Sequence, residues 1–404
     1  GSVERKCKTH TVGVVKVDKP CYPAASPYHP SEDYPEYPFR GRISGEPNYV
    51  YGGVRRLLAE LGLDRERFGT LDWNPLGELI QPGMTVVIKP NFVASRNKSG
   101  DIWATITHPS VLRAIADYCR VALKGDGRII IADAPQYDCN FDDLMSISGL
   151  PAVCDLFNGT HGPSLEVRDL RNYWSRGKHF PSMTIPLPGD PQGSITVDLG
   201  NKSALVGKKP DKLYGAVYHR QELVSRHTGE RHEYQVARTI MDADVVISVP
   251  KLKVHKKVGV TLNMKGLVGI CTNKNLLVHY TLCSPSEGGD QYPEGHFSPM
   301  EEKLIKLERW MYDHLLARRS VALEYLHRSI YWVHGTFIKP LGIGVAAKKR
   351  QLDAGNWYGN DSAWRMTVDL LRIFYFADAD GKLRDTPQRR AFSIIDGIIG
   401  GEND

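Results

Sequence analysis

Residues 244–270 read DVVISVPKLKVHKKVGVTLNMKGLVGI, and this stretch decides the fold. Val245–Val249 is a short, almost fully apolar run rich in β-branched side chains, with an acidic residue before it and a proline after it. Such a run predicts a strand that is buried on both faces of a parallel sheet. Ligands of open α/β sheets bind just beyond the carboxyl ends of strands, where lysine and histidine residues gather in this chain. We therefore expect a site for an anionic or electron-rich ligand at this strand end.

The segments on either side of this strand alternate between strands and helices. Short apolar runs predict strands at residues 11–17, 84–88, 128–132 and 392–395. Apolar residues at helical spacing predict helices at residues 49–61 and 141–157, the second with a break near Gly149, and a third helix opens at His108-Pro-Ser. This order predicts an α/β fold, with a mostly parallel sheet and helices on both faces.

Five segments are expected along the chain. Residues 1–159 form the first part of the α/β core with a Pro-rich N-terminal loop, residues 160–235 a β-rich insertion, residues 236–299 the central strand with its Lys/His motif, residues 300–345 a helical excursion, and residues 346–404 the end of the core. Two interpretations of residues 300–345 are open. One is a basic amphipathic helix that makes peripheral contact with a membrane surface. The other, which we favour, is a long helix packed on the sheet with lysine and arginine facing solvent.

The composition is that of an ordinary globular protein. The 404 residues are 41% hydrophobic and 24% charged, and the net charge is +6. This mild excess favours a small anionic ligand and lacks the dense basic stripe that indicates a nucleic-acid partner. No apolar run approaches the ~20 residues that span a bilayer, and no signal-peptide pattern is present. We expect a cytoplasmic protein.

The motifs of common cofactors are absent from the sequence. The cysteine count is odd, at seven, and no Cys-x-x-Cys occurs, which argues against a zinc ribbon or an iron–sulfur cluster. No strand–GxGxxG–helix unit and no GxxxxGK[ST] motif occurs, so we expect no NAD and no P-loop nucleotide. The cofactor is therefore unassigned, and a divalent metal is an alternative.

Polar side chains follow three of the predicted strands. Lys89 and Asn91 follow residues 84–88, Asp133 follows residues 128–132, and Lys251 and Lys253 follow Val245–Val249. Because the carboxyl ends of parallel strands meet at one rim of the sheet, we expect these side chains to form a single site. Asp396 is a further carboxylate beside a predicted strand.

Each candidate residue has a chemistry that suits an anion site. Lys89, Lys251 and Lys253 can neutralise a phosphate or carboxylate, and Asn91, Asn263 and His279 can hydrogen-bond it. His108, His255, Lys265 and Asp133 are the candidate catalytic residues, because imidazole, a desolvated amine or a carboxylate can move or orient protons. Lys256 and Lys257 are expected on a solvated basic loop.

Several phrases of the sequence resemble the bacterial family called domain of unknown function 362. These are VVIKPNF at 86–92, THP at 107–109, ADAP at 132–135, ADVVISVPKLKVH at 243–255, TLNMKGLVG at 261–269 and IDGI at 395–398. The form WYGNDSAWR at 357–365 resembles members that tend to lie beside polysaccharide-biosynthesis genes. The resemblance therefore implies a role in polysaccharide biosynthesis. Some relatives carry iron–sulfur modules whose cysteines this chain lacks.

A second resemblance is to the N-terminal domain of the nickel-pincer lactate racemase group. In that group a histidine precedes a cofactor-tethering lysine by nine intervening residues, and a second histidine follows. His255, Lys265 and His279 match that spacing here. The chain departs from the group in having Leu262-Asn263-Met264 in place of a Gly-Gly pair, and the departure falls at the tethering position.

Three functions are consistent with these features. The first, which we favour, is an enzyme that acts on a phosphorylated or carboxylated small molecule, such as a sugar derivative, by Lys/His acid–base chemistry of the epimerase, isomerase or lyase type. The second is metal-assisted phosphoryl or glycosyl transfer with Asp133 and histidines as ligands. The third is a non-catalytic binding or assembly protein in polysaccharide export.

Overall fold

The computed structural model describes residues 11–97, 100–175, 184–215, 219–314, 320–333, 336, 345–346 and 348–402, so part of the predicted excursion at 300–345 lies outside the described residues. The helices are α1 (Tyr49–Glu60), α2 (Pro109–Leu123), α3 (Phe141–Ser148), α4 (Leu150–Asn158), α5 (Arg220–Arg226), α6 (Arg238–Met241), α7 (Asn263–Gly266), α8 (Pro299–His314), α9 (Val321–Val333) and α10 (Ala363–Phe376). The strands are β1 (Thr85–Pro90), β2 (Arg128–Asp133), β3 (Ser164–Asp169), β4 (Tyr173–Ser175), β5 (Thr184–Pro186), β6 (Ser194–Asp198), β7 (Leu213–Tyr214), β8 (His227–Thr228), β9 (Arg231–Ala237), β10 (Val245–Val249), β11 (Lys251–His255), β12 (Gly259–Thr261), β13 (Tyr280–Thr281), β14 (Arg390–Ser393) and β15 (Asp396–Gly401).

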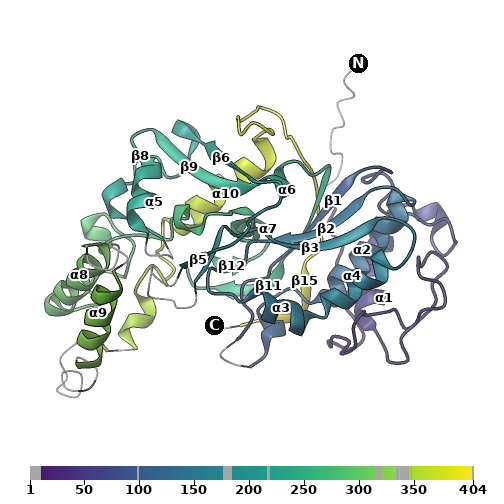
Figure 1. Ribbon diagram of the computed structural model, residues 1–404, viewed down its shortest axis with the longest axis horizontal. Coiled ribbons are helices and arrows are strands. Elements are labelled where there is room, and N and C mark those ends of the chain that lie inside the picture. Colours follow the sequence, from purple (N-terminus) through teal and green to yellow (C-terminus); the bar gives the residue numbers. More distant parts are fainter. Residues whose placement is uncertain are drawn as a thin grey trace.

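A five-stranded sheet in the order β14-β10-β1-β2-β3 forms the centre of the molecule (Figure 1). Every neighbouring pair is parallel, and Ile88 lies opposite both Ile247 of β10 and Ile131 of β2. The predicted parallel sheet is therefore confirmed. β3 is its edge strand, so the sheet takes in a segment that the sequence analysis assigned to the β-rich insertion.

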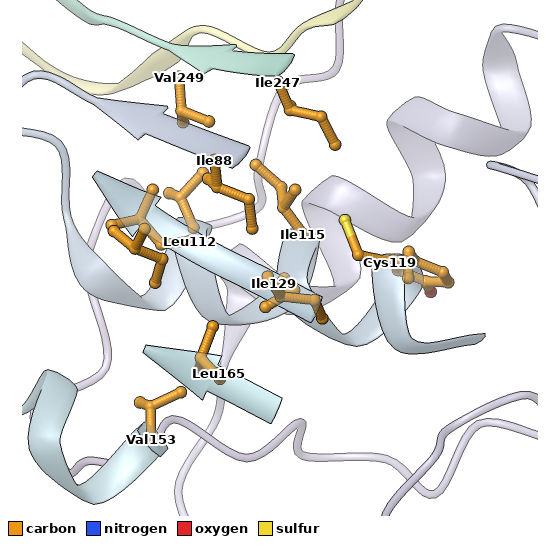
Figure 2. Packing of buried hydrophobic residues seen from close by; sticks show 14 of the residues in the cluster. Ile88, Leu112, Ile115, Cys119, Ile129, Val153, Leu165, Ile247 and Val249 are labelled. Atoms are coloured by element: carbon orange, nitrogen blue, oxygen red, sulfur yellow. The ribbon is translucent and has the colours of Figure 1, made fainter. Parts of the chain in front are cut away.

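Both faces of this sheet are covered, because successive side chains of a strand point to opposite faces. Val86 and Ile88 pack with α1, α2 and α4 on one face. Figure 2 shows the α2 residues Leu112 and Ile115 lying over Ile88. Val87 packs on the other face, in a second core that includes residues of α6, α10, β6 and β9. The expectation of helices on both faces is confirmed, and it explains why β1 and β10 have almost no polar residues.

The N-terminal segment differs from its prediction. Residues 11–17 form no strand, although their apolar residues alternate. The segment lies along α1 instead, where the Arg56 Nη2 atom donates to the Lys16 carbonyl at 3.1 Å. A side chain at Gly13 would come within 3.0 Å of Leu57. The edges of the main sheet belong to β3 and β14, so alternation alone did not supply this segment with a pairing partner.

Two strands of the main sheet continue into a smaller sheet at its carboxyl edge. Pro250 separates β10 from β11, and β14 likewise leads to β15; β11 pairs in parallel with β15 and antiparallel with β12. The proline carbonyl accepts a hydrogen bond from the Asp396 amide at 2.9 Å. Lys251, Lys253 and His255 therefore lie on a strand of this smaller sheet.

Two helices, α8 and α9, occupy the region in which we favoured one long helix packed on the sheet. The buried Ile305 of α8 lies in a small cluster with Tyr292, Phe297 and Val345, separate from the two cores of the main sheet. The favoured interpretation is therefore wrong. Figure 1 shows α8 and α9 side by side at the end of the molecule farthest from α1 and α2. In the described part of the chain, each helix is too short or too polar to cross a bilayer.

Candidate functional site

A buried ion pair joins the carboxyl ends of β1 and β2. The Lys89 Nζ atom lies 2.8 Å from Asp133 Oδ1, and both side chains are buried. The other carboxylate oxygen accepts from the Phe92 amide at 2.7 Å, and Lys89 also donates to the Pro90 carbonyl at 2.8 Å. Gly269 lies against the pair, since a Cβ there would be 1.8 Å from Asp133 Oδ1. Lys89 and Asp133 thus hold each other at the rim.

A second buried ion pair lies where β11 meets β15. The Lys251 Nζ atom is 3.2 Å from Asp396 Oδ2 and 2.6 Å from the Tyr22 hydroxyl, which donates to Asp396 Oδ1 at 2.6 Å. Lys251 and Asp396 have fully buried side chains. This three-residue network connects the N-terminal loop to the last described strand. Within it, the Asp396 carboxylate neutralises the charge of Lys251.

His108 belongs to the same network. Its amide donates to Asp396 Oδ2 at 2.9 Å, and its ring stacks on Tyr22 with the centroids 4.0 Å apart. The ring nitrogen Nδ1 accepts from the Ser110 amide at 3.1 Å, so His108 caps α2. Burial, and then the charge of Lys251, lower the pKa of His108 to about 3, which leaves the ring neutral at pH 7. This geometry gives His108 a structural role; its catalytic role stays a prediction.

The two candidate asparagines also make internal contacts. The backbone amide of Asn91 donates to Thr107 Oγ1 at 2.9 Å, which holds the end of β1 against the segment that leads into α2. Asn263 is exposed, and its Oδ1 atom accepts from the Ser393 hydroxyl at 2.6 Å. Neither contact tests their predicted role in ligand binding.

A third group of residues is different, because it is cationic and poor in acidic partners. We define the lysine–histidine cluster as Lys253, His255, Lys257, Lys265, Lys274 and His279. The cluster is built by β11, the β11–β12 turn, α7, the short 3-10 helix η7 (Lys274–Leu276) and the residue before β13. The charges of these residues act on one another's pKa values, so the small sheet and the loops after it bring them together.

Lys265 has a lower pKa than Lys257 or Lys274. Desolvation lowers its pKa to about 7, and the next largest causes are the charges of four lysines: Lys253, Lys274, Lys89 and Lys257. Among the described residues, its ammonium makes no hydrogen bond or ion pair. The side chain is only partly buried, so solvent reaches it. Lys265 is therefore a partly deprotonated amine at neutral pH.

The two histidines of the cluster are neutral and are held in opposite tautomers. Burial and the neighbouring lysines lower the pKa of His255 to about 2 and that of His279 to about 3. His255 Nδ1 accepts from the Lys257 amide at 3.2 Å, so its proton is on Nε2. His279 Nδ1 lies 2.9 Å from the Leu277 carbonyl, so its proton is on Nδ1 and Nε2 has a lone pair.

Sequence reasoning missed two lysines of the cluster. Lys257, which we expected on a solvated loop, donates to Asn356 Oδ1 at 2.8 Å and to the Ala354 carbonyl. Desolvation lowers its pKa to about 8. Lys274 is buried, its pKa is likewise lowered to about 8 by desolvation, and it donates to the Val268 carbonyl at 2.7 Å. The only available signal was the polar turn Asn273-Lys274-Asn275.

Glu222 holds the turn that carries Lys274. One carboxylate oxygen accepts from the Asn273 amide group at 2.7 Å, and the other from that of Asn275 at 2.8 Å. The Tyr173 hydroxyl donates to Asn273 Oδ1 at 2.9 Å and accepts from the Asn275 backbone amide at 3.0 Å. These bonds fix a buried lysine against the repulsion of its neighbours.

Three surface hollows lie in another part of the molecule from the lysine–histidine cluster. They surround the 3-10 helix η4 (Gly200–Lys202), with Asp198, Asn201 and Arg231 among the lining residues, and none of the cluster residues lines these three. Across the described ranges, no three His, Cys, Asp or Glu side chains are grouped so that they could hold a metal ion.

Comparison with known proteins gives a family without a described activity. No curated protein matches the chain. A crystal structure of a protein from Thermotoga maritima is similar at 12% identity, covering 58% of this chain and 41% of that chain, with a TM-score of 0.29 that carries no argument. The model of the family called domain of unknown function (DUF362) matches residues 86–188 and 196–404, which include every cluster residue. The chain therefore belongs to the family domain of unknown function (DUF362).

Proposed function

We propose that the lysine–histidine cluster binds a carboxylated or phosphorylated small molecule, and that Lys265 and His255 transfer protons on it, as in an epimerase, isomerase or lyase. The observation that carries the proposal is Lys265 itself. Its amine is partly buried among four lysines, and no acidic partner is present among the described residues. A bound anion would supply the missing negative charge.

Binding is favoured because like charges are already gathered and partly desolvated. Burying these lysines costs free energy in the empty protein, because desolvation lowers the pKa values of Lys257, Lys265 and Lys274, and at Lys265 the charges of neighbouring lysines lower the pKa further. An anion relieves that repulsion, and charge-assisted hydrogen bonds to it are stronger than neutral ones. The same anion would raise the pKa of Lys265, so binding at mildly alkaline pH takes up a proton.

The proton chemistry follows from the state of each group at pH 7. In those complexes in which Lys265 is deprotonated, its amine can remove a proton from the carbon next to a carboxylate or carbonyl group, and a pKa of about 7 in the empty site keeps that form accessible near neutral pH. The Nε2–H group of His255 can donate to the oxygen on which negative charge develops. A proton delivered to the other face of the carbon by a second acid, while Lys265 keeps the one it removed, gives an epimer; expelling a leaving group from the neighbouring carbon gives a lyase product.

The two alternatives have less support. Metal-assisted transfer would need Asp133, whose oxygens already accept from Lys89 and the Phe92 amide, and its histidines lie among lysines that repel a divalent cation. A sugar substrate and a role in polysaccharide biosynthesis or export are implied by resemblance, and both stay predictions.

Calorimetric titration with inorganic phosphate at pH 8 tests the binding step. Measurements in two buffers of different ionisation enthalpy report the protons taken up. We expect proton uptake with the unaltered protein. With Lys265→Met we expect no uptake and affinity at least about tenfold weaker, the loss of one charge-assisted contact. Lys256→Met, at an exposed neighbouring lysine, is the matched control and keeps both. Equal affinity for the two variants would remove Lys265 from the site.

Deuterium exchange in D₂O tests the chemical step. A panel of aldonic and uronic acids is incubated with the protein, and loss of the proton signal next to the carboxylate is followed by NMR. We expect exchange that Lys265→Met abolishes and that His255→Gln slows by about a hundredfold. Phosphate binding without exchange on any member of the panel would leave a binding site and contradict the acid–base step for this substrate class.

A further inference from the structure

The segment at 357–365 that reads WYGNDSAWR is not part of the lysine–histidine cluster, yet two of its polar residues are buried. Asn360 and Ser362 are 5% and 0% exposed. A buried amide destabilises the fold unless its donors and its acceptor find partners. The partners of Asn360 therefore show what the segment holds in place.

The Asn360 side chain joins three parts of the chain. Its Oδ1 atom accepts from the backbone amides of Ser362 and Ala363, at 3.0 and 2.8 Å, where α10 begins. Its Nδ2 atom donates to the carbonyls of Gly355 and His279, both at 2.9 Å. The same amide group therefore holds the start of α10, the turn at Gly355 and the cluster residue His279.

The turn at Gly355 is also the one that holds Lys257. The Lys257 ammonium donates to the Ala354 carbonyl and to Asn356 Oδ1, so its acceptors are the residues on either side of Gly355. Gly355 has a φ of +78°, and a Cβ there would clash with Asn360 Nδ2. Glycine suits both this conformation and this close approach. Asn360 therefore packs directly against the turn that carries the acceptors of Lys257.

A buried carboxylate attaches the same segment to β13. Asp290 is 2% exposed, and its Oδ2 atom accepts from the Asp361 amide at 2.9 Å and from the Ser362 hydroxyl at 2.6 Å. Its Oδ1 atom accepts from the Thr281 amide at 2.5 Å. The Thr281 and Ser362 hydroxyl oxygens are 2.8 Å apart. β13 directly follows His279, so His279 is held on both sides.

We propose that Asn360 is a positioning residue that fixes Lys257 relative to His279. One Nδ2–H group reaches the turn that holds Lys257, and the other reaches His279. An ammonium has three N–H groups, and the turn uses two of those of Lys257, so it sets the direction of the third. A group that is already oriented loses less conformational entropy when an anion binds. The use of this position in anion binding rests on the proposed function of the cluster, whereas the position itself is measurable without a ligand.

Chemical labelling of Lys257 in the full chain, with no ligand present, tests the position. Asn360→Ser keeps an oxygen that can cap α10 and removes both donated hydrogen bonds. We expect acetic anhydride to label Lys257 at least about threefold faster in this variant, because losing a buried hydrogen bond releases the turn. Asn356→Ala removes one acceptor of Lys257 directly and should act in the same direction. Mass spectrometry measures the rate against the exposed Lys256 of the same chain.

The matched control is Asn48→Ser at the start of α1. Asn48 is 3% exposed, its Oδ1 atom accepts from the Tyr51 amide, and its Nδ2 atom donates to the carbonyls of Tyr28 and His29. The substitution removes the same kinds of contact, but none of these partners belongs to the cluster. Labelling of Lys257 should therefore stay as it is in the unaltered protein.

Calorimetric titration with inorganic phosphate measures what the position contributes to binding. We expect Asn360→Ser to weaken binding at least about threefold and Asn48→Ser to leave it unchanged. In the double variant of Asn360→Ser with Lys257→Met, the loss of affinity should be smaller than the product of the two single losses, because Asn360 acts through Lys257.

Several results would overturn the inference. One is labelling of Lys257 that is equal in Asn360→Ser, in Asn48→Ser and in the unaltered protein, and another is unchanged labelling in Asn356→Ala. Losses that multiply in the double variant would also contradict it, since Asn360 would then act by another route. Faster labelling in a protein that binds no phosphate would confirm the position of Lys257 and reject the proposed function of the cluster.

Discussion

Lys251 and Lys265 lie on the same small stretch of chain, and both are withdrawn from water, yet their surroundings are opposite. Lys251 is fully buried, and the Asp396 carboxylate lies 3.2 Å from its ammonium. Lys265 keeps some access to solvent, and the strongest charges acting on it are four other lysines. One positive charge is neutralised inside the protein, and the other is left without a counterion among the described residues.

The surroundings of the two lysines decide which of them is available for chemistry. A buried ion pair satisfies itself, so removing either partner leaves an expensive lone charge but changes no ligand contact. An unpaired buried amine destabilises the fold, but it suits a binding site, because a ligand can supply the negative charge that no residue of the protein provides. The sequence placed both lysines in one site; the structure separates a structural pair from a candidate site.

The largest effect should come from breaking the structural pair. Asp396→Asn leaves the Lys251 charge buried without a counterion, and we expect the free energy of unfolding to fall by about 3–5 kcal/mol. Urea unfolding measures it. Asp378→Asn is the control, because that carboxylate pairs with the half-exposed Arg384, and its loss should cost far less than the loss of Asp396. Equal losses in the two variants would mean that burial of the Lys251 pair has no special cost.

The next effect sharpens the comparison at the other structural pair. Gly269→Ala would place a Cβ 1.8 Å from Asp133 Oδ1 and 2.5 Å from Lys89 Nζ, so the pair must move. We expect a loss of about 1–3 kcal/mol in thermal or urea unfolding. Gly266→Ala is the matched control, since its nearest neighbour, Pro250 Cβ, is 3.8 Å away. An equal response of the two variants would show that the rim tolerates displacement of the pair.

At Lys265 the sign of the effect should reverse. Lys265→Met removes a charge that only repels its neighbours and keeps much of the side-chain volume. We expect the free energy of unfolding at pH 7 to rise by about 1–2 kcal/mol while phosphate affinity falls at least about tenfold, because replacing a poorly compensated charge by an apolar group is often stabilising. Lys251→Met, measured in parallel, should destabilise the protein by leaving Asp396 unpaired. Destabilisation at both positions would erase the contrast between the two lysines.

The main sheet was predictable because the residue pattern of each central strand indicates that the strand is buried. β1, β2 and β10 are nearly uninterrupted apolar runs, as strands buried on both faces must be. β3 alternates Leu165 and Val167 with polar and charged residues, so its pattern suggested an insertion strand although it completes the main sheet. A half-buried edge strand and a strand of a small separate sheet have the same pattern, and only pairing distinguishes them.

The residues of the candidate site could be predicted from the sequence, but the residues that contact them could not. The cations after β10 were identified, but the counterion of Lys251 lies 145 residues away and its third partner, Tyr22, is in the N-terminal loop. Such contacts depend on how the two sheets are joined. Lys274 was missed for the same reason. Its surroundings come from Glu222 and from the loop before β13, and no local sequence pattern indicates that these segments meet.

The smallest effect concerns how the gain of Lys265→Met depends on pH. The pKa of Lys265 is about 7 in the folded protein, against 10.5 for an ordinary lysine, so the unfolded chain binds more protons between these values. Stability contributed by this group therefore rises as the pH rises from 7 toward 10.5, where both states become neutral and the penalty disappears. The advantage of Lys265→Met over the unaltered protein should shrink over that range, by no more than its ~1–2 kcal/mol size at pH 7.

Lys257 and Lys274 are present in both proteins, so the difference between two sets of urea unfolding curves isolates Lys265. A difference that stays constant with pH would show that Lys265 has an ordinary pKa. Lys265 would then not be the more reactive of the two lysines, and its contrast with Lys251 would not explain any chemistry at the site.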